Sequence, residues 1–225
     1  TAVARFAEWL AKQPGCTLYF GTAVAEIEAG RITTQAGDTI EAEKIIICSG
    51  SDTRTLFPEA LVLSDFCLCK LQMLRTPPQP EGWRLGPHLA SGLTLRHYRR
   101  FEACPSFPAL RARIEEETPE LDRFGIHVLA AQNDRGEVLL GDSHEYDADI
   151  DPADKPEIDE LILREVRKMI RLPDWTIAKR WHGLYVKHPK QSVIDVEPIE
   201  GVRIVTGFGG AGMTLALGYA DLYWK

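Results

Sequence analysis

The chain has 225 residues, 44% of them hydrophobic and 26% charged, which is the composition of a globular protein large enough for a core of its own. Its formal net charge of −7 argues against a general grip on nucleic acid, because such a grip needs clustered Lys and Arg. No apolar run reaches the roughly 20 residues that cross a bilayer, and no signal-peptide pattern opens the chain. A cytoplasmic protein with no membrane span and no nucleic-acid partner is predicted.

The first part of the chain is expected to combine one helix with several strands. Helical spacing of apolar residues predicts a helix over residues 1–13, ended by Pro14 and Gly15. Three antiparallel strands are then expected in "TLYF", "AVAEIEA" and "RITTQ", followed by the apolar strand "KIIICSG". Ser51 or Asp52 is placed to cap a helix directly after that strand.

A second unit is predicted to begin near residue 62 with the long alternating strand "LSDFCLCKLQMLRT". Alternation places Cys67 and Cys69 on one face of this strand, as small buried hydrophobic residues. The chain has five cysteines, scattered and without a C-x-x-C pair, so neither a disulfide framework nor a zinc site is expected.

The rest of the chain alternates between helices and strands. A strand at 92–98, a helix near 107–117, a hairpin with its turn at 133–136 and a helix over 156–170 are expected. Three strands, "IAKRWHGLYVK", "SVIDVEP" and "VRIVTG", then lead into a glycine-rich turn and a final helix. These elements predict an α+β fold, related to the α/β class.

The segment "GFGGAGMTLALGY" places four glycines within six residues, directly before the last helix. The first N–H groups of a helix are unpaired and carry the positive end of its dipole, and glycines allow a ligand to approach the backbone closely. Helix–sheet packing also selects glycine, so both interpretations are open. The spacing matches neither a Walker A sequence nor the dinucleotide fingerprint.

The residues of "GFGGAGMTLALGYA" resemble the carboxyl-terminal flavin motif of the FAD-dependent amine- and amino-acid-oxidising enzymes of the glycine oxidase, sarcosine oxidase and D-amino-acid oxidase type. Two further segments resemble that family in the same order. Residues 22–56 are similar to its three-stranded β-meander and following strand, and "RWHGLYVKHPKQSVIDVEP" is similar to the strand pair before the terminal motif. Details of the sequence are most similar to a bacterial subgroup associated with aminophosphonate metabolism.

The resemblance implies a domain organisation. Residues 1–61 would be the remainder of an FAD-binding domain, residues 62–178 a substrate-binding domain built on a mixed or antiparallel sheet, and residues 179–225 a return to the FAD-binding domain. The strand, G-x-G-x-x-G and helix that open such proteins are absent before Thr1. The chain is therefore expected to be a carboxyl-terminal portion that binds FAD poorly when isolated.

The resemblance also implies the cofactor contacts. Non-covalent FAD is expected, because Gly183 stands where some relatives carry the cysteine that attaches the flavin. Val24 matches a position whose backbone contacts the adenine side, with a plain core valine as the alternative. Ser49 and Gly50 end a strand that would pass under the cofactor, with close packing as the alternative. The expected flavin contacts in the terminal turn are Gly207, Phe208, Gly209, Gly210, Ala211, Gly212, Met213 and Thr214.

The substrate side is expected around the strand "RWHGLYVK". Tyr185 stands where glycine oxidase-like sequences carry a carboxylate-binding Arg, and it is the candidate catalytic residue. Alternation sends Tyr185 and Lys187 to one strand face and His182 to the other. Lys187 is positioned to meet an anionic substrate group; solvated strand surfaces are the alternative explanation of these cations. The expected substrate-binding residues are Arg96, His97, His182, Tyr185 and Lys187, the first two from a basic cluster that also holds Arg99 and Arg100.

A metal site is considered at "GDSHEY", which places Asp142, His144 and Glu145 close together. Because that stretch has a single imidazole, no metal site is predicted there, and His144 beside a substrate pocket is the other functional interpretation. His97 and His127 lie in apolar segments, where hydrogen-bonded structural histidines are the default expectation.

The leading hypothesis is therefore an FAD-dependent oxidoreductase that deaminates or demethylates a small amine bearing an anionic group. Hydride would pass to the flavin, and peroxide would be released on reoxidation. One alternative is a non-catalytic binding domain or fragment that no longer holds FAD. Another is a flavin amine dehydrogenase that passes its electrons to a different acceptor.

Overall fold

The computed structural model describes residues 2–62 and 65–223. By packing, the chain forms two compact units: unit 1 comprises residues 1–61 and 195–205, and unit 2 comprises residues 62–194 and 206–225. Residues 179–194 thus pack with the central part of the chain, whereas the domain organisation inferred from sequence similarity groups them with the terminal segment; that functional division stays a prediction. None of the described helices combines the length and apolar character that a bilayer crossing demands.

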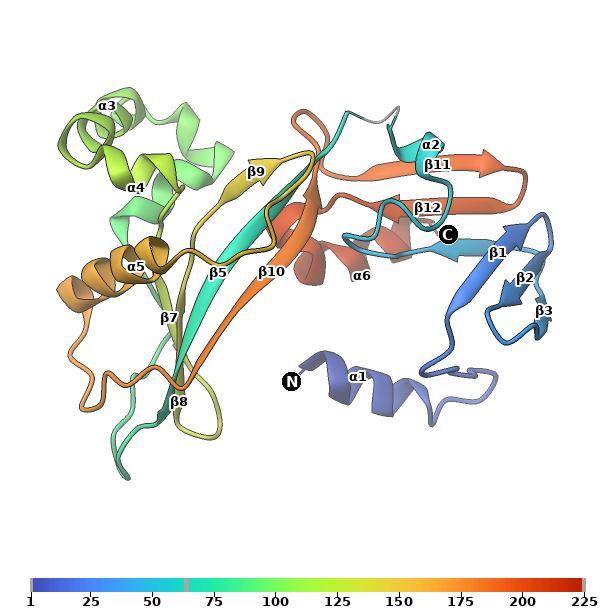
Figure 1. Ribbon diagram of the computed structural model, residues 1–225, viewed down its shortest axis with the longest axis horizontal. Helices are drawn as coiled ribbons and strands as arrows, with labels where there is room; N and C mark the ends of the chain where they lie inside the picture. The colour runs from blue at the N-terminus through green and yellow to red at the C-terminus, as the bar shows by residue number, and fades with distance from the viewer. Residues whose placement is uncertain (1, 63–64, 224–225) are drawn as a thin grey trace. The chain divides into compact units, whose positions relative to one another are not determined.

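Unit 1 contains two small sheets and the amino-terminal helix (Figure 1). Strands β1 (Val24–Glu28), β2 (Arg31–Thr34) and β3 (Thr39–Glu41) form an antiparallel meander in the order β1-β2-β3. In the second sheet β12 (Val202–Thr206) lies between β11 (Ile194–Ile199) and β4 (Ile45–Ile47), and it runs parallel to β4. The core of this unit comes from apolar residues of these strands, namely Ile27, Ile45, Ile47, Val202, Ile204 and Val205.

Two expectations for unit 1 are wrong. The segment "TLYF" is not a strand, because it has no partner strand to satisfy its backbone, and Tyr19 and Phe20 are 63% and 74% exposed. No helix follows Ser51 directly: the Asp52 carboxylate accepts the N–H groups of Arg54 and Thr55, which turns the chain locally. The helix there, α2 (Pro58–Val62), begins only at Pro58.

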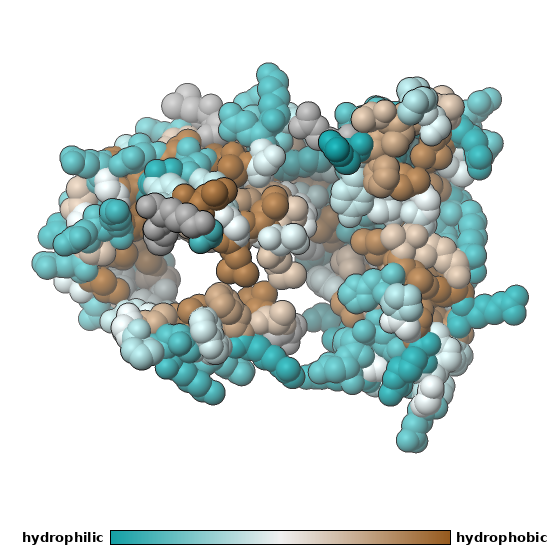
Figure 2. Space-filling model, turned by 180° about the vertical axis from the view of Figure 1, so that it is seen from behind, coloured by the Kyte–Doolittle hydropathy of each residue, from teal (hydrophilic) through white to brown (hydrophobic). Residues whose placement is uncertain are grey.

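The predicted amino-terminal helix is present as α1 (Ala2–Leu10), but it buries no residue. Its apolar side chains Val3, Phe6 and Trp9 are all about half or more exposed, and the rings of Phe6 and Trp9 stack 5.7 Å apart. The spacing of apolar residues thus predicted the helix correctly. Within the described residues, however, no other element covers its apolar face. Figure 2 shows brown, apolar residues reaching the surface at several places on the face that it draws.

Unit 2 is built on a six-stranded antiparallel sheet in the order β10-β5-β8-β7-β6, with β9 also paired to β5. In Figure 1, β5 and β10 run side by side. The strands are β5 (Cys67–Pro78), β6 (Leu89–Ala90), β7 (Leu129–Gln132), β8 (Glu137–Gly141), β9 (Glu145–Asp147) and β10 (Lys179–Lys187). The helices are α3 (Phe107–Glu117), α4 (Pro119–Arg123), α5 (Pro156–Met169) and α6 (Gly212–Tyr223), with 3-10 turns η1 (Gly92–His97), η2 (Arg99–Ala103) and η3 (Gly209–Ala211).

The two faces of this sheet differ in what covers them. On β5, Lys70, Gln72 and Leu74 are buried on the face that packs against α5, where Leu74 joins the core with Leu140 and Ile162. The predicted apolar stripe of the 156–170 helix supplies the other side of that core. Odd-numbered residues of β5 and β10 point the opposite way.

The register between β10 and β5 confirms the predicted alternation. Tyr185 lies opposite Cys69, and Lys187 lies opposite Cys67, so all four belong to one face. His182 lies opposite Gln72, on the other face. The fold class is therefore α+β, with an antiparallel sheet in the larger unit, as the sequence predicts.

Residues 92–98 were expected to be a strand, and this is wrong. They form the 3-10 helix η1 over Gly92–His97. A 3-10 helix repeats every three residues, so Thr94 and His97 lie on the same side of it, and both contact His127. A strand would have placed Thr94 and His97 on opposite faces.

Candidate active site

The glycine-rich turn follows β12 and leads through η3 into α6. Gly207 has φ 79°, and a Cβ there would lie 2.9 Å from Ile194 Cγ1, so packing and backbone conformation alone require glycine at this position. Gly209 also has positive φ, but a Cβ on it would meet only the ring of Tyr185, at 3.8 Å. Gly210 is exposed, and its Cβ position is 3.9 Å from Tyr185 Oη. The turn therefore presents bare backbone next to Tyr185.

Tyr185, which is half-buried, lies opposite the buried Cys69 on the sheet face that points away from α5, called the open face below. Burial is the main cause that raises the pKa of the Tyr185 phenol above its ordinary value, and the neighbouring Cys69 adds to the effect. Burial likewise raises the pKa of the Cys69 thiol to about 11, although hydrogen bonding to Tyr185 and Tyr146 opposes it. At neutral pH Tyr185 is a neutral phenol and Cys69 a thiol, so the phenol is available as a hydrogen-bond donor.

Lys187 lies at the edge of this cluster, held by Tyr146 of β9. Its Nζ donates to Tyr146 Oη at 3.1 Å and lies 4.5 Å from the centroid of the same ring. The backbone of Lys187 bridges to Phe208, next to the glycine-rich turn. Lys187 forms no ion pair with a carboxylate within the ranges 2–62 and 65–223. A half-buried cation of this kind attracts an anion.

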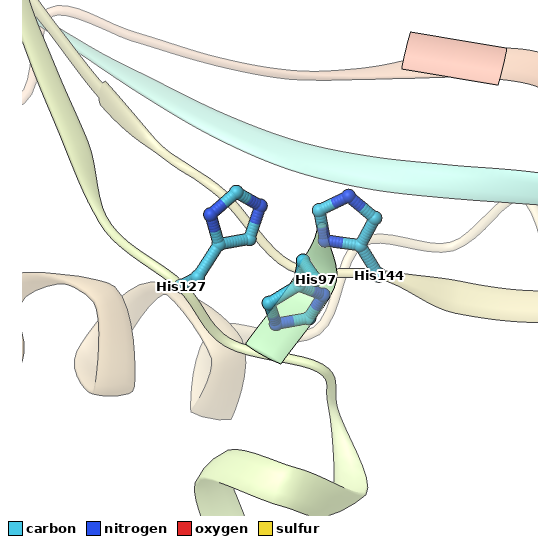
Figure 3. A group of neighbouring side chains, drawn as sticks. All are labelled: His97, His127 and His144. Carbon is cyan, nitrogen blue, oxygen red and sulfur yellow. The ribbon is translucent and has the colours of Figure 1, made fainter. Parts of the chain in front are cut away.

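Three histidines lie close together, as Figure 3 shows. The ring of His144 also lies next to that of Tyr146, with the two centroids 6.0 Å apart. His97 comes from η1, His127 precedes β7, and His144 lies between β8 and β9. The ring centroids are 4.3 Å apart for His97 and His127, 4.9 Å for His97 and His144, and 4.7 Å for His127 and His144. One nitrogen from each ring lies within 4.8 Å of the others, so the trio is also a candidate metal-binding group.

The surroundings of the histidines keep two of them neutral. Burial lowers the pKa of His97 to about 2, and the neighbouring histidines and Arg96 add to that effect. Burial also lowers the pKa of His144 to about 4, with Asp142 opposing the shift. His127 Nε2 lies 2.9 Å from Asp142 Oδ1, but the two atoms are not aligned as a hydrogen bond. At neutral pH His97 and His144 therefore offer one N–H donor and one lone pair each.

The hydrogen bonds of two rings indicate their tautomers. Arg96 Nε donates to His97 Nε2 at 3.2 Å, which leaves the proton of neutral His97 on Nδ1. His144 Nδ1 lies 3.3 Å from the carbonyl oxygen of Gly125, which can only accept, so His144 carries its proton there. The lone pair of His144 is then on Nε2.

The structure brings together only part of the substrate-binding set expected from the sequence. Tyr185 and Lys187 share one sheet face, while His97 and Arg96 lie nearby around the histidine trio. His182 lies on the opposite face, where its Nδ1 is 2.8 Å from Asp154 Oδ1. The structure thus separates His182 from Tyr185.

The residues expected at the adenine side lie in unit 1. Val24 begins β1 and is half-buried, opposite Thr34. Ser49 follows β4 and donates its hydroxyl to the Asp52 carbonyl oxygen at 2.7 Å. Gly50 has φ 64°, with no atom near its Cβ position, so its backbone conformation and not close packing selects glycine. Their roles in cofactor binding stay predictions.

Three neighbours of the site were not anticipated as functional residues: Tyr146, His127 and Asp142. Tyr146 reaches Cys69 through the pairing of β9 with β5, a contact between residues far apart in sequence. His127 and Asp142 are joined by reciprocal backbone hydrogen bonds at the end of the β7–β8 hairpin. The ladder of the hairpin pairs Leu129 with Gly141, which would place His127 opposite Ser143; a one-residue shift beyond the ladder brings His127 opposite Asp142, so the predicted hairpin did not contain this pairing.

Comparison with known proteins assigns the family. The family model described as FAD dependent oxidoreductase (DAO) matches residues 2–223, so the chain belongs to this family. FAD is the cofactor of that family. No curated protein shows significant sequence similarity to the chain.

Solved structures of other proteins share the fold of this chain. L-proline dehydrogenase from P. horikoshii has a TM-score of 0.67 at 19% identity, covering 96% of this chain and 51% of its own. Glycine oxidase from Geobacillus kaustophilus has a TM-score of 0.55 at 15% identity, with 92% and 49% covered. L-amino acid deaminase from Proteus vulgaris has a TM-score of 0.52 at 19% identity, with 92% and 45% covered. The chain thus spans about half the length of these structures, and the likeness shows the fold.

The described residues of the terminal turn fit one edge of a flavin. The space beside Gly209 and Gly210 would be narrowed by a Cβ on either residue. Helix α6 has 12 residues, and its first N–H groups have no partner within the helix, so they are available to acceptors on a ring edge. Backbone N–H groups and the neutral phenol beside them are all hydrogen-bond donors. Such donors suit a ring system that becomes anionic when it is reduced.

Proposed function

We propose that the protein containing this chain is an FAD-dependent oxidoreductase that oxidises a small primary or secondary amine bearing an anionic group, with a phosphonate among the candidate groups. The observation that carries the proposal is the position of Tyr185, which packs against the bare Gly209–Gly210 turn. Lys187, to which the described residues offer no carboxylate partner, lies on the same sheet face. Membership of the FAD dependent oxidoreductase family supports it. The names of the similar structures, which include an L-proline dehydrogenase and a glycine oxidase, point to the same class of substrate.

The cofactor would be held non-covalently, in part by the backbone of residues 207–214. Val24, Ser49 and Gly50 of unit 1 are the candidate contacts on the adenine side. When bound, FAD supplies a two-electron acceptor for the hydride on the carbon next to the amine. Cys69 has a pKa of about 11 and is a weak nucleophile at neutral pH, which supports a non-covalent arrangement.

The chain's own residues would position and neutralise the substrate. Tyr185, kept protonated by its raised pKa, donates a hydrogen bond to a substrate or ring acceptor above the turn. Lys187, fixed by Tyr146, attracts the anionic group of the substrate. The substrate amine must be neutral to release a hydride. Water then hydrolyses the resulting imine to a carbonyl compound, with release of ammonia from a primary amine and of a smaller amine from a secondary one.

The decisive experiment uses the protein as its gene encodes it, with any sequence that flanks this chain. The purified protein is expected to show a flavin absorption spectrum, and FAD is expected to be released by denaturation. Under anaerobic conditions, amines bearing a carboxylate or phosphonate should bleach that spectrum, and uncharged amines of the same size should do so more slowly. A protein that takes up no FAD under any reconstitution conditions would contradict the proposal.

Reoxidation then separates two modes of turnover. Stoichiometric peroxide on admission of air indicates an oxidase. Slow reoxidation by air with fast reoxidation by a quinone indicates a dehydrogenase. A Tyr185→Phe variant, which keeps the ring against the turn, should retain the flavin spectrum. The rate at which the amine reduces its flavin should fall by about tenfold or more.

A further inference from the structure

The three histidines drawn in Figure 3 bring together segments that are far apart in the sequence. One ring nitrogen from each of His97, His127 and His144 lies within 4.8 Å of the others. Imidazole nitrogens are common ligands of Zn²⁺, and ligand atoms about 2.05 Å from one tetrahedral ion are about 3.3 Å apart. Movement of each ring by about 1 Å therefore brings all three within reach of one ion.

Two of the rings are hydrogen-bonded in the way that metal ligands are. His144 Nδ1 donates to the carbonyl oxygen of Gly125 at 3.3 Å. His127 Nδ1 lies 3.3 Å from Thr94 Oγ1, whose lone pairs can accept its N–H. A histidine that binds a metal ion almost always donates its other ring N–H to an oxygen acceptor, which fixes the tautomer and orients the ring. His127 and His144 are thus held so that each presents the lone pair of Nε2.

The carboxylate of Asp142 is a separate observation that points to a cation. Its Oδ1 is buried and has no hydrogen-bond partner among the described residues, although it lies 2.9 Å from His127 Nε2. With the proton of His127 donated to Thr94, two acceptor atoms face each other, and this is unfavourable unless a cation lies beside both. Two ligand atoms about 2.05 Å from one ion and at right angles are about 2.9 Å apart. The separation of Oδ1 and Nε2 is therefore that of two ligands of one ion.

The charges around the cluster leave this carboxylate available to a cation. Arg96, which contacts His97, is itself paired with Asp122 and donates to two backbone carbonyl oxygens. In the part of the chain that the structure describes, Asp142 has no Lys or Arg partner. An ion bound here would be neutralised in part by Asp142, while the charge of Arg96 is already offset by other groups.

His97 is expected to be the weakest of the ligands. Its Nε2 accepts a hydrogen bond from Arg96 Nε at 3.2 Å, so an ion has to compete with that bond for the ring. His97 and His144 also line a pocket of about 590 Å³, which gives an ion a path from solvent to the cluster. The contributions to affinity should therefore be unequal, with His127 and His144 larger than His97.

We propose that His97, His127, His144 and Asp142 form a binding site for a divalent transition-metal ion, with Zn²⁺ as the expected occupant. Imidazole nitrogens suit Zn²⁺ and its neighbours, whereas Mg²⁺ and Ca²⁺ require mainly oxygen ligands. The bound ion would tie η1 to the residues that flank the β7–β8 hairpin. The site goes beyond the proposed amine oxidation, because it requires neither FAD nor a substrate.

The test is a metal titration of the protein as its gene encodes it, after removal of metal by a chelator. Calorimetry should show one Zn²⁺ bound per chain with a Kd of about 1 μM or lower, and no binding of Mg²⁺ at about 1 mM. Saturating Zn²⁺ should raise the Tm of the chelated protein, because the ion binds the folded state. Co²⁺ in place of Zn²⁺ should give visible absorption bands, which report coordination in the wild type without any substitution.

Substitutions then assign the ligands. His144→Gln, on the segment between β8 and β9, should weaken Zn²⁺ binding by about a hundredfold or more, and His97→Gln should weaken it by about tenfold. Asp142→Asn should also weaken binding, because it removes the negative charge beside His127 Nε2. The matched control is His88→Gln, at an exposed histidine outside the cluster, which should leave the affinity unchanged.

Three results overturn the proposal: no binding of Zn²⁺ below about 100 μM, equal binding of Zn²⁺ and Mg²⁺, or a His144→Gln variant that binds Zn²⁺ as the wild type does. Absence of the Co²⁺ absorption bands in the wild type overturns it as well. The titration detects the ion and not the flavin, so its outcome is independent of whether the protein oxidises an amine.

Discussion

Two lysines on neighbouring strands of the same sheet have opposite environments. Lys70 of β5 is 1% exposed on the face that packs against α5, and its Nζ donates to the carbonyl oxygens of Asp151 and Ala153, with Glu145 and Asp154 within 3.9 Å. Lys187 of β10 is half-buried on the other face, where the described residues offer it only a phenol oxygen and a ring.

This difference shows how a buried charge can be assigned to structure or to function. The hydrogen-bonding capacity of Lys70 is used within the fold, so its burial needs no ligand to explain it. The hydrogen-bonding capacity of Lys187 is only partly used within the fold, and the residue lies next to the glycine-rich turn. A residue that binds a ligand is expected to have such unused capacity. The same contrast holds between Gln72, fully hydrogen-bonded beneath α5, and Tyr185 above the turn.

The largest effect is expected from removing the buried charge. Lys70→Met would leave two backbone carbonyls and two carboxylates without their shared cation, and should lower the free energy of unfolding by about 3 kcal/mol. Urea denaturation measures this. Lys187→Met serves as the matched control and should change stability by less than about 1 kcal/mol while weakening substrate binding. Equal destabilisation by the two variants would contradict the contrast between the faces.

The next effect concerns the histidines at the end of the open face, where Asp142, Arg96 and Lys187 are the charged groups that act on them. The folded-state pKa values of His97 and His144, about 2 and about 4, lie below the ordinary value of 6.5. At a pH between the folded-state pKa and 6.5, the unfolded chain binds more protons than the folded chain. The contribution of these histidines to stability is therefore fully present above about pH 6.5 and is lost as the pH falls below it. At pH 5.5 the loss should be about 1 kcal/mol per histidine.

Urea midpoints of the wild type and of His144→Gln, compared at pH 7.5 and pH 5.5, measure this loss. The variant should lose less stability than the wild type over the same interval, because one of the two titrating rings is gone. A variant with the same pH dependence as the wild type would show that His144 is not held neutral by the fold.

Local patterns in the sequence predicted the parts of the site that lie within single elements. Alternation placed Tyr185 and Lys187 on one face without any knowledge of the partner strand, because the period of a strand is fixed by its geometry. The helix expected over 156–170 was predicted from the helical spacing of its apolar residues, and the hairpin from its turn at 133–136; the structure has them as Pro156–Met169 and as β7 with β8. The terminal turn was recognisable because its residues resemble the flavin motif of the family, whereas the four glycines alone left helix–sheet packing open as an explanation.

The histidine trio could not be predicted in the same way. His97, His127 and His144 come from three segments, and they meet because η1 is a 3-10 helix and because a one-residue shift beyond the hairpin ladder places His127 opposite Asp142. The stretch "GDSHEY" contains a single imidazole, so no metal site was predicted there. The other two imidazoles of the group, His97 and His127, are brought to His144 only by tertiary packing. The failed strands at 17–20 and 92–98 have the same origin, since a short apolar run forms a strand only where a partner edge is available.

The smallest effect is expected at Tyr146, which positions Lys187 on the open face. Tyr146→Phe removes the hydroxyl that accepts from Lys187 but keeps the ring beneath its ammonium, so Lys187 keeps its charge and loses its fixed direction. A hydrogen bond to a charged group of this exposure should contribute about 1 kcal/mol, so KM for the amine should rise by about fivefold, with kcat changed by less than about twofold. Tyr19→Phe, at an exposed tyrosine of unit 1, is the control and should change neither. Because a purely structural role for Tyr146 would lower stability and leave KM unaltered, the split between KM and kcat decides whether Lys187 acts on the substrate from the position that Tyr146 holds.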